Sequence, residues 1–174
     1  MRVGIGYDIH RVNGTRPLKL GGVLIPSARG LAGHSDADVL LHAIADALFG
    51  ALGEPDIGEQ FPSDNPRWRN ADSRTFVETA WASARRRGWA ISNIDTTVIA
   101  DAPRLTRFKG SIRRSIGRLL GLDPSRVSVK AKTTEGFDPK GRGIAAQAVV
   151  LLEPAVVRRH AARRRPATRK RRTR

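Results

Sequence analysis

Short apolar runs bounded by glycine, proline and asparagine alternate along this chain with longer segments that have the character of helices. The short runs predict strands at residues 2–10, 18–26, 89–101, 126–133 and 143–154. The longer segments predict helices that end at Gly53, Gly88 and Gly121, the last of them opened by Pro103. The predicted order is β-β-α-α-β-α-β-β, which indicates an α+β fold: a single domain with one mixed β-sheet packed on helices.

The first predicted helix follows a glycine-containing loop. Ser35 or Asp36 is its expected N-cap, with Asp38 in the first turn. After this helix, residues 56–71 are polar and interrupted by prolines, so we expect a long irregular loop. Loops of this length are usually functional or disordered.

The amino-acid composition limits the size of the core, the expected location and the kinds of metal ligand that the protein can use. The 174 residues suffice for one domain with a real core, and 40% of them are hydrophobic. No apolar run is long enough to cross a bilayer, and Met1 leads almost directly into a strand, so we expect no signal peptide and a cytoplasmic location. The chain has no cysteine, which excludes disulfides, thiolate nucleophiles and sulfur-bound zinc. Any metal must therefore be held by His, Asp or Glu.

The net charge of +16 is concentrated at the C-terminal end. Residues 158–174 contain ten Lys or Arg and no acid, so the rest of the chain carries only about +6. We predict a folded domain over 1–154 and a basic, disordered tail over 155–174. Such a tail is either a solvated extension or a nonspecific contact for RNA, DNA or anionic lipid.

The run "IGYDIH" carries Asp8 and His10 two positions apart on the first predicted strand. Residues i and i+2 of a strand point to the same face, so the carboxylate and the imidazole lie side by side. The pair fits a hydrogen bond at the end of the sheet. It equally fits two ligands of a metal ion.

The first helix offers a third ligand. In "DVLLHAIAD", Asp38, His42 and Asp46 are spaced i, i+4, i+8 and form one polar stripe on an apolar helix. The stripe fits a buried His–Asp cluster, and His42 also completes a set of two histidines and one carboxylate with Asp8 and His10, as in open zinc sites. We expect Asp38 or Asp46 to accept the second ring N–H of His42. Spacing does not distinguish zinc from manganese or iron.

Phosphate-binding motifs are mostly absent. The early glycines do not form a dinucleotide fingerprint, because Ile9 replaces the third glycine and a strand follows. The best candidate is "KAKTTEGFDPKGRG", where a strand end leads into hydroxyls, glycines, Lys140 and Arg142. Hydroxyls, amides and an arginine suit phosphate, and Glu135 suits a hard divalent cation. An ordinary loop between strands is the alternative interpretation.

Five collinear motifs then carry a resemblance: "GYDIHR", "GHSDADVLLHAIADALFGALGEPDIGEQFP", "ADSR", "ADAPRL" and "VKAKTTEG…GRG". From Arg2 to about Pro154 the chain resembles the 2-C-methyl-D-erythritol 2,4-cyclodiphosphate synthases of the non-mevalonate isoprenoid pathway. The resemblance implies a homotrimer with active sites at subunit boundaries. It also implies a lyase that converts 4-diphosphocytidyl-2-C-methyl-D-erythritol 2-phosphate into the cyclic diphosphate and CMP.

The resemblance further implies roles for individual residues. The metal ligands are Asp8, His10 and His42 for zinc, and Glu135 for a magnesium or manganese ion beside the substrate phosphates. His34 and Thr133 steady the transition state. The remaining substrate contacts are Ser35, Asp56, Ile57, Gly58, the mobile-loop residues Phe61, Pro62, Ser63, Asp64 and Asn65, the cytidine pocket Ala100, Asp101, Ala102, Pro103, Arg104, Leu105 and Thr106, the phosphate contacts Lys132 and Thr134, and Arg142.

Two positions depart from the family's usual pattern. Phe137 falls earlier than the usual phenylalanine, and Lys132 stands where a threonine is common. Two other functions remain open from the residues themselves. One is a metal-dependent phosphohydrolase with the same ligands, and the other is a nucleic-acid-binding protein that acts through its basic tail.

Overall fold

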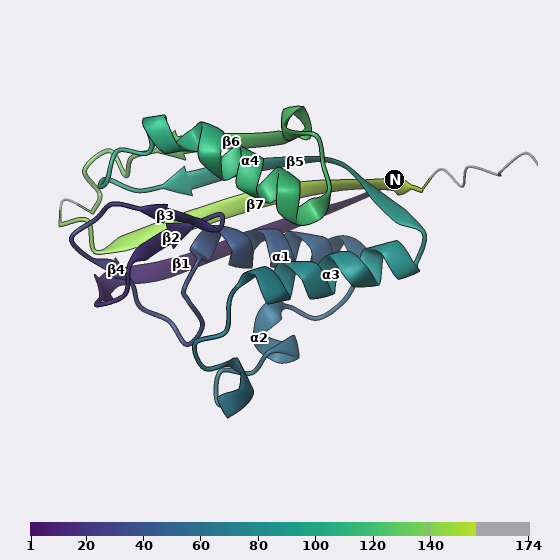
Figure 1. Cartoon of the computed structure of the whole chain (residues 1–174), viewed down its shortest axis with the longest axis horizontal. Coiled ribbons are helices and arrows are strands. Elements are labelled where there is room, and N and C mark those ends of the chain that lie inside the picture. The colour runs from purple at the N-terminus through teal and green to yellow at the C-terminus, as the bar shows by residue number, and fades with distance from the viewer. Residues whose placement is uncertain (139, 156–174) are drawn as a thin grey trace, which may run out of the picture.

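The computed structural model describes residues 1–138 and 140–155. A five-stranded sheet with the order β4-β1-β7-β5-β6 forms the centre of the molecule (Figure 1). Its strands are β1 Arg2–Gly14, β4 Gly30–Leu31, β5 Trp89–Ile99, β6 Val127–Lys132 and β7 Gly143–Pro154. β5 and β6 are parallel, and every other neighbouring pair is antiparallel. The α+β fold with a mixed sheet is therefore confirmed.

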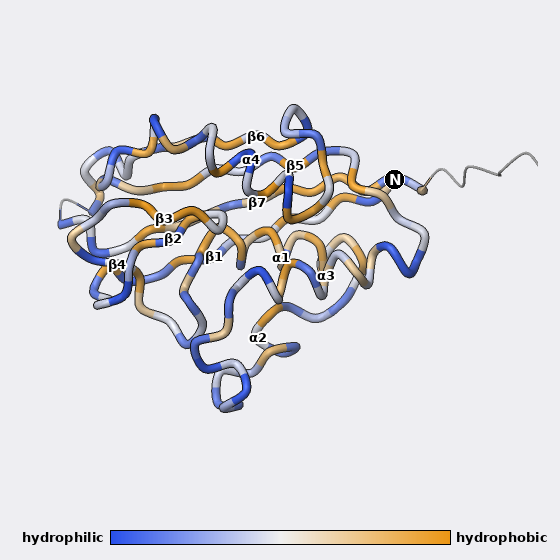
Figure 2. The backbone as a smooth tube through the Cα atoms, in the orientation of Figure 1, coloured by the Kyte–Doolittle hydropathy of each residue, from blue (hydrophilic) through white to orange (hydrophobic). Residues whose placement is uncertain are grey.

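The helices pack on one face of this sheet (Figure 1). They are α1 Val39–Leu52, α2 Ile57–Gln60, α3 Arg74–Arg86 and α4 Lys109–Leu120, with single 3-10 turns at Pro66–Trp68, Thr106–Phe108 and Pro124–Arg126. Helix α1 lies against β1 and β7, and nearly all of its side chains are buried. Figure 2 shows α1 as largely hydrophobic, as its burial between the sheet and α3 requires.

The two faces of β1 differ sharply because strand side chains alternate. The even-numbered positions, from Gly4 onward, face α1. The odd-numbered positions leave four large side chains exposed on the opposite face: Val3, Ile5, Tyr7 and Ile9, with 56–67% of their surface accessible. A contiguous exposed apolar strip of this kind is typical of a protein–protein contact.

Two predictions about the N-terminal elements were wrong. The second predicted strand is a hairpin of β2 Leu18–Leu20 and β3 Val23–Ile25, which forms a separate two-stranded sheet. Gly21 and Gly22 both have positive φ and make its turn, a conformation that glycine adopts without strain. The N-cap of α1 is Asp38, whose carboxylate accepts the amide of Leu41 at 3.1 Å, and neither Ser35 nor Asp36 caps the helix.

Helical structure also departs from prediction around the prolines. Pro103 does not open a helix, because the chain remains irregular until Thr106, and α4 itself begins at Lys109. Residues 56–71 are not wholly irregular: Asp56 caps α2 by accepting the amide of Glu59 at 3.0 Å. The predicted disordered tail, residues 155–174, lies outside the described part of the chain except for Ala155. Among the described residues, no helix has both the length and the apolar character needed to cross a membrane.

Candidate metal centre and substrate pocket

Asp8, His10 and His42 converge at the edge of the helix layer, and we call them the metal-binding group. Asp8 and His10 share the α1-facing side of β1, and α1 places His42 opposite them. The Asp8 Oδ2 atom lies 2.9 Å from His10 Nε2 and 2.9 Å from His42 Nδ1. One ligand atom from each residue lies within 4.8 Å of the other two, so the group can hold a metal ion. Strand periodicity predicted the first pair and the helix stripe offered His42 as the third ligand, and the structure brings all three together.

The charges within the group are coupled: the two histidines keep Asp8 ionised, and a metal ion would have to displace the proton that Asp8 favours on His10. Burial opposes ionisation of Asp8, but hydrogen bonds and charge from the two histidines outweigh it, and the pKa of Asp8 is lowered. Burial likewise opposes charge on His10, but its interaction with Asp8 prevails and raises the pKa of His10. The ring nitrogen of His10 that faces away from Asp8, Nδ1, donates to the carbonyl of Ala32 at 2.8 Å. This bond leaves Nε2 to serve as the ligand atom, the arrangement found in protein metal sites.

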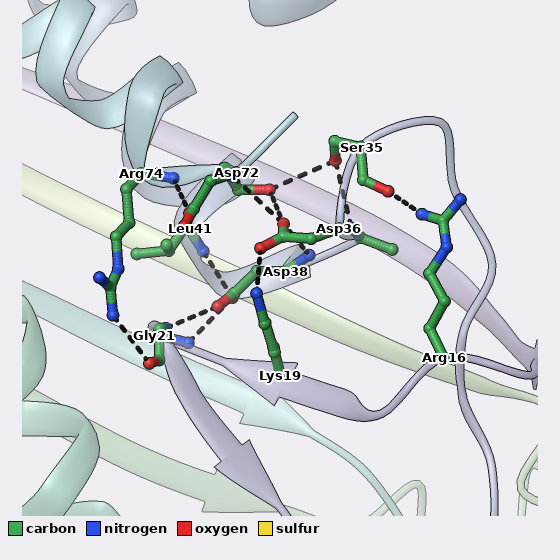
Figure 3. Close-up of polar contacts among 12 residues, drawn as sticks. Arg16, Lys19, Gly21, Ser35, Asp36, Asp38, Leu41, Asp72 and Arg74 are labelled. Atoms are coloured by element: carbon green, nitrogen blue, oxygen red, sulfur yellow. Dashed lines mark hydrogen bonds and ion pairs between the residues drawn. The ribbon is translucent and has the colours of Figure 1, made fainter. Parts of the chain in front are cut away.

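The expected partner of the second His42 nitrogen was wrong. His42 Nε2 lies near the hydroxyls of Ser73 at 2.9 Å and Ser35 at 3.0 Å, and neither Asp38 nor Asp46 is bonded to the ring. The Asp38 carboxylate instead accepts amides from the β2–β3 turn, including that of Gly21 (Figure 3). Neighbouring positions of a helix stripe are about 6 Å apart along the axis, so partners from other segments compete for each side chain.

Asp46 contributes to the site in a different way. Its Oδ1 atom accepts the amide of Ile57 at 2.8 Å, which ties the start of α2 to α1. Burial raises the pKa of Asp46, and the hydrogen bond from Ile57 opposes this. Asp46 therefore holds the segment from Asp56 to Gly58 beside the metal-binding group.

A pocket of about 230 Å³ opens next to the metal-binding group. Its lining combines two of the ligands with predicted substrate contacts and two aromatic side chains that were not predicted: His10, His42, Gly33, His34, Ser35, Ile57, Gly58, Phe61, Ser63, Trp68 and Phe76. Phe61 packs on Phe76 at 4.5 Å with the rings tilted by 36°, and it meets Trp68 edge-on at 4.9 Å, both measured between ring centroids. The pocket thus has an aromatic wall that meets the metal-binding group where Phe76 lies 5.7 Å from the His42 ring, between centroids.

The predicted nucleotide loops, residues 100–106 and 132–135, lie together but away from this pocket. The amide of Thr134 donates to Asp101 Oδ1 at 2.8 Å, and the Thr134 hydroxyl donates to Asp101 Oδ2 at 2.6 Å. β1 and β6 are separated by β7 and β5, and three steps of strand spacing amount to roughly 14 Å. One chain therefore brings the loops to each other and does not bring Thr133 to the metal-binding group.

The remaining predicted residues have local partners. The hydroxyl of Thr133 donates to Glu135 Oε1 at 2.5 Å, and Lys132 is exposed beside them. Arg142 donates from Nε to Asp138 at 3.1 Å. Phe137 is 93% exposed and makes no core contact. Among the predicted mobile-loop residues, Asn65 caps the 3-10 turn that begins at Pro66. The others, Pro62 and Asp64, are exposed.

Sequence reasoning missed several side chains that shape the site. Arg16 donates to the carbonyls of Gly33 and Ser35 and to Asn70 Oδ1, and the amide of Asn70 donates to the carbonyl of His34 at 2.7 Å. The backbone around His34 is thereby held from both sides, and Figure 3 shows Arg16 reaching Ser35. No spacing rule links these residues, because Arg16 and Asn70 are 54 positions apart.

Fold and site together define an α+β protein with a metal-binding group of two histidines and one aspartate that opens into a pocket. The chain belongs to the YgbB family, whose model matches residues 1–153. That range covers all four described helices and the mixed sheet except for the last residue of β7.

Individual relatives agree with this assignment. The chain is 52% identical to a 2-C-methyl-D-erythritol 2,4-cyclodiphosphate synthase of Geobacillus kaustophilus, over 87% of this chain and 98% of the relative. It is 52% identical to the synthase of Geotalea uraniireducens, over 88% of this chain and 99% of the relative. A solved structure of such a synthase in a CDP-bound form is similar at a TM-score of 0.82 and 39% identity, over 87% of this chain and 100% of that one.

Proposed function

We propose that this chain is a 2-C-methyl-D-erythritol 2,4-cyclodiphosphate synthase. It converts 4-diphosphocytidyl-2-C-methyl-D-erythritol 2-phosphate into the cyclic diphosphate and CMP, a step in isoprenoid precursor synthesis. The observation that carries the proposal is the convergence of Asp8, His10 and His42 beside the pocket that holds His34. This arrangement occurs in a chain about half identical to curated synthases over nearly their whole length.

The reaction is an intramolecular transfer of a phosphoryl group. An oxygen of the 2-phosphate forms a bond to the β-phosphorus, and the bond from that phosphorus to the oxygen bridging toward CMP breaks. The nucleophile is already an anion, so the site must position two anionic groups and stabilise the leaving charge, without a strong base. A divalent ion at the metal-binding group, and a magnesium or manganese ion at Glu135, would supply positive charge to the phosphate oxygens.

The position of each side chain suggests which part of the substrate it binds. The pocket with its aromatic wall receives the methylerythritol part, bounded by Ile57, Gly58 and Phe61. His34 and Thr133 donate hydrogen bonds to phosphate oxygens in the transition state. The nucleotide loops bind the cytidine and its phosphates, with Lys132 and Arg142 adding positive charge.

We further propose that the site is completed between subunits of a homotrimer. Within one chain, the metal-binding group and the nucleotide loops are about three strands apart, too far for one phosphate group to contact both. The exposed apolar strip on β1 supplies a surface through which copies of the chain can associate. A neighbouring copy then brings its nucleotide loops to the pocket.

Product analysis tests the proposed reaction directly. The purified protein is incubated with the cytidine diphosphate substrate, zinc and magnesium, and the products are identified by phosphorus NMR. We expect CMP and a cyclic diphosphate in equal amounts. Release of inorganic phosphate with a linear product would instead establish the metal-dependent phosphohydrolase.

Two variants test the residue roles. His42→Ala is expected to abolish zinc binding and turnover while the trimer persists, and retention of wild-type zinc content and activity would contradict the metal assignment. Thr133→Ala is expected to lower kcat more than it weakens binding, because its role is confined to the transition state.

A chain truncated after Pro154 is expected to keep its catalytic activity, whereas an activity that depends on the basic tail would be lost.

A further inference from the structure

The two ring nitrogens of His42 contact different groups on opposite sides of the imidazole. Nδ1 faces the metal-binding group, 2.9 Å from Asp8 Oδ2. Nε2 faces inward, 2.9 Å from the hydroxyl of Ser73. His42 is 6% exposed, so water cannot readily replace a lost partner on the inner side. In this structure the Asp8 carboxylate accepts from Nδ1. When a metal ion takes the place of the Nδ1 proton, the remaining ring proton must lie on Nε2, and a side chain behind the ring must accept it.

The polarity of the contact with Ser73 follows from its other partner. The Ser73 hydroxyl donates to Asp36 Oδ1, and the backbone amide of Ser73 donates to the same oxygen at 3.2 Å. A serine hydroxyl has only one hydrogen, so its lone pairs are left to accept from His42 Nε2. The Nε2–H tautomer is the one that presents the Nδ1 lone pair to a metal.

Asp36 is held as a carboxylate behind this serine. Lys19 donates to Asp36 Oδ2 at 3.0 Å from strand β2, as Figure 3 shows. Burial opposes ionisation of Asp36, but its hydrogen bonds with Ser73 and Lys19 prevail and lower its pKa. Lys19, Asp36, Ser73 and His42 thus form a continuous chain of hydrogen bonds that ends at the proposed metal.

Ser73 is the residue before α3, a position at which a serine hydroxyl usually caps the helix. Here it makes no capping bond, and Asp72 instead accepts the amide of Arg74 at 3.0 Å. The hydroxyl is turned into the interior, where Ser73 has no exposed surface. Helix capping therefore does not account for this serine, and its contacts with Asp36 and His42 do.

We propose that Ser73, supported by Asp36 and Lys19, is a positioning residue for the metal ligand His42. It accepts the Nε2–H of His42, which fixes the ring orientation, directs Nδ1 at the metal and increases the basicity of that nitrogen. The inference rests on the metal site of the proposed function. Ser35 lies equally close to the ring, but within the described chain its hydroxyl contacts only the ring, Ser73 and the amide of Ala37, with no carboxylate behind it.

Zinc affinity, measured by competition with a chromophoric chelator, tests the proposal without reference to catalysis. Ser73→Ala is expected to bind zinc about 10–100-fold more weakly than the wild type, the usual effect of losing such a partner. Asp36→Asn keeps the shape and removes the charge, so its affinity should fall between the two. Ser83→Ala is the matched control: Ser83 is also buried on α3, but it donates to Glu54, far along the helix from His42. Its zinc affinity should equal that of the wild type.

Nitrogen NMR of the zinc-loaded wild type provides a readout that needs no variant. Long-range ¹H–¹⁵N spectra should show His42 with a proton on Nε2 and zinc on Nδ1. The opposite tautomer would overturn the proposal, and so would unchanged zinc affinity in Ser73→Ala or an equal loss in Ser83→Ala. If the wild type binds zinc and the variants rank as expected but no CMP forms, the positioning role stands and only the proposed reaction fails.

Discussion

Gly6 lies in β1 where the strand crosses α1, two residues before Asp8. A Cβ atom added at Gly6 would lie 2.0 Å from the carbonyl oxygen of Ala43 and 2.7 Å from the amide nitrogen of Ala47. Both are backbone atoms of α1, and a Cβ essentially never comes within 3.0 Å of such an atom. In Gly6→Ala the strand and the helix must therefore separate by about 1 Å.

This separation acts directly on the metal-binding group, because Ala43 follows His42 in the chain. Metal–ligand distances tolerate deviations of only about 0.2 Å, so a shift of about 1 Å between Asp8 and His42 exceeds the tolerance several-fold. We expect zinc affinity to fall at least about tenfold. Overpacking of this kind also costs about 1–3 kcal/mol in the free energy of unfolding, or about 2–4 °C in Tm per kcal/mol for a chain of this size.

The assay combines urea unfolding of the metal-free protein with chelator competition for zinc. Gly50→Ala is the matched control, since a Cβ at Gly50 meets only the carbonyl of Ile5, at an ordinary 3.7 Å. Gly50 lies within α1, so alanine there should stabilise the fold by about 0.5–1 kcal/mol. The reasoning is refuted if Gly6→Ala keeps wild-type stability and zinc affinity, or if Gly50→Ala is equally damaging.

Three further predictions concern other parts of the structure. Asp36→Asn should lower the free energy of unfolding by about 1.5–3 kcal/mol at pH 7. The pKa of Asp36 is lowered below 3.8 in the folded protein, so the stability that its carboxylate contributes is present above that pH and lost below it. The difference in unfolding free energy between variant and wild type should therefore shrink in acid, and a constant difference down to pH 2 would contradict this. Arg16→Lys should lower kcat by about 10–100-fold with little change in Tm, since a lysine cannot bridge the two carbonyls beside His34; full activity in a steady-state assay would disprove the role of the guanidinium. Ile5→Asp should convert the proposed trimer into monomers by light scattering and remove turnover, because it charges the exposed strip; a stable active trimer would exclude that face as the interface.

The glycines of β1 show what spacing in the sequence could exclude and what it could not explain. Their spacing excluded a dinucleotide fingerprint but did not show why glycine occurs there. The structure shows that Gly4 and Gly6 have the backbone of α1 against them, with added Cβ atoms at 1.9 and 2.0 Å. A close approach between two elements depends on how they pack, and a local pattern contains no such information.

The lack of packing information in local spacing also explains why Asp38 and Asp46 were wrongly predicted as partners of His42. The i, i+4 spacing predicted Asp38 and Asp46 on one stripe with His42, but Asp38 is the N-cap outside α1, and the spacing did not show what faces either aspartate. Asp38 is occupied by the β2–β3 turn, and Asp46 by the start of α2. Ser73, which does contact His42, comes from a segment 31 residues away and resembles an ordinary helix cap in sequence.

The sequence by itself determined the local facts: strand periodicity put Asp8 and His10 on one face, glycines ended the helices, and the lack of cysteine restricted any metal to nitrogen and oxygen ligands. The first two follow from geometry that repeats every two to four residues, and the third follows from composition alone. Only the tertiary structure decided that α1 brings His42 to the same point, that Ser73 and Asp36 lie behind it, and that the nucleotide loops lie several strands away. Those contacts join segments that are distant in the chain, and they depend on how the helices pack on the sheet.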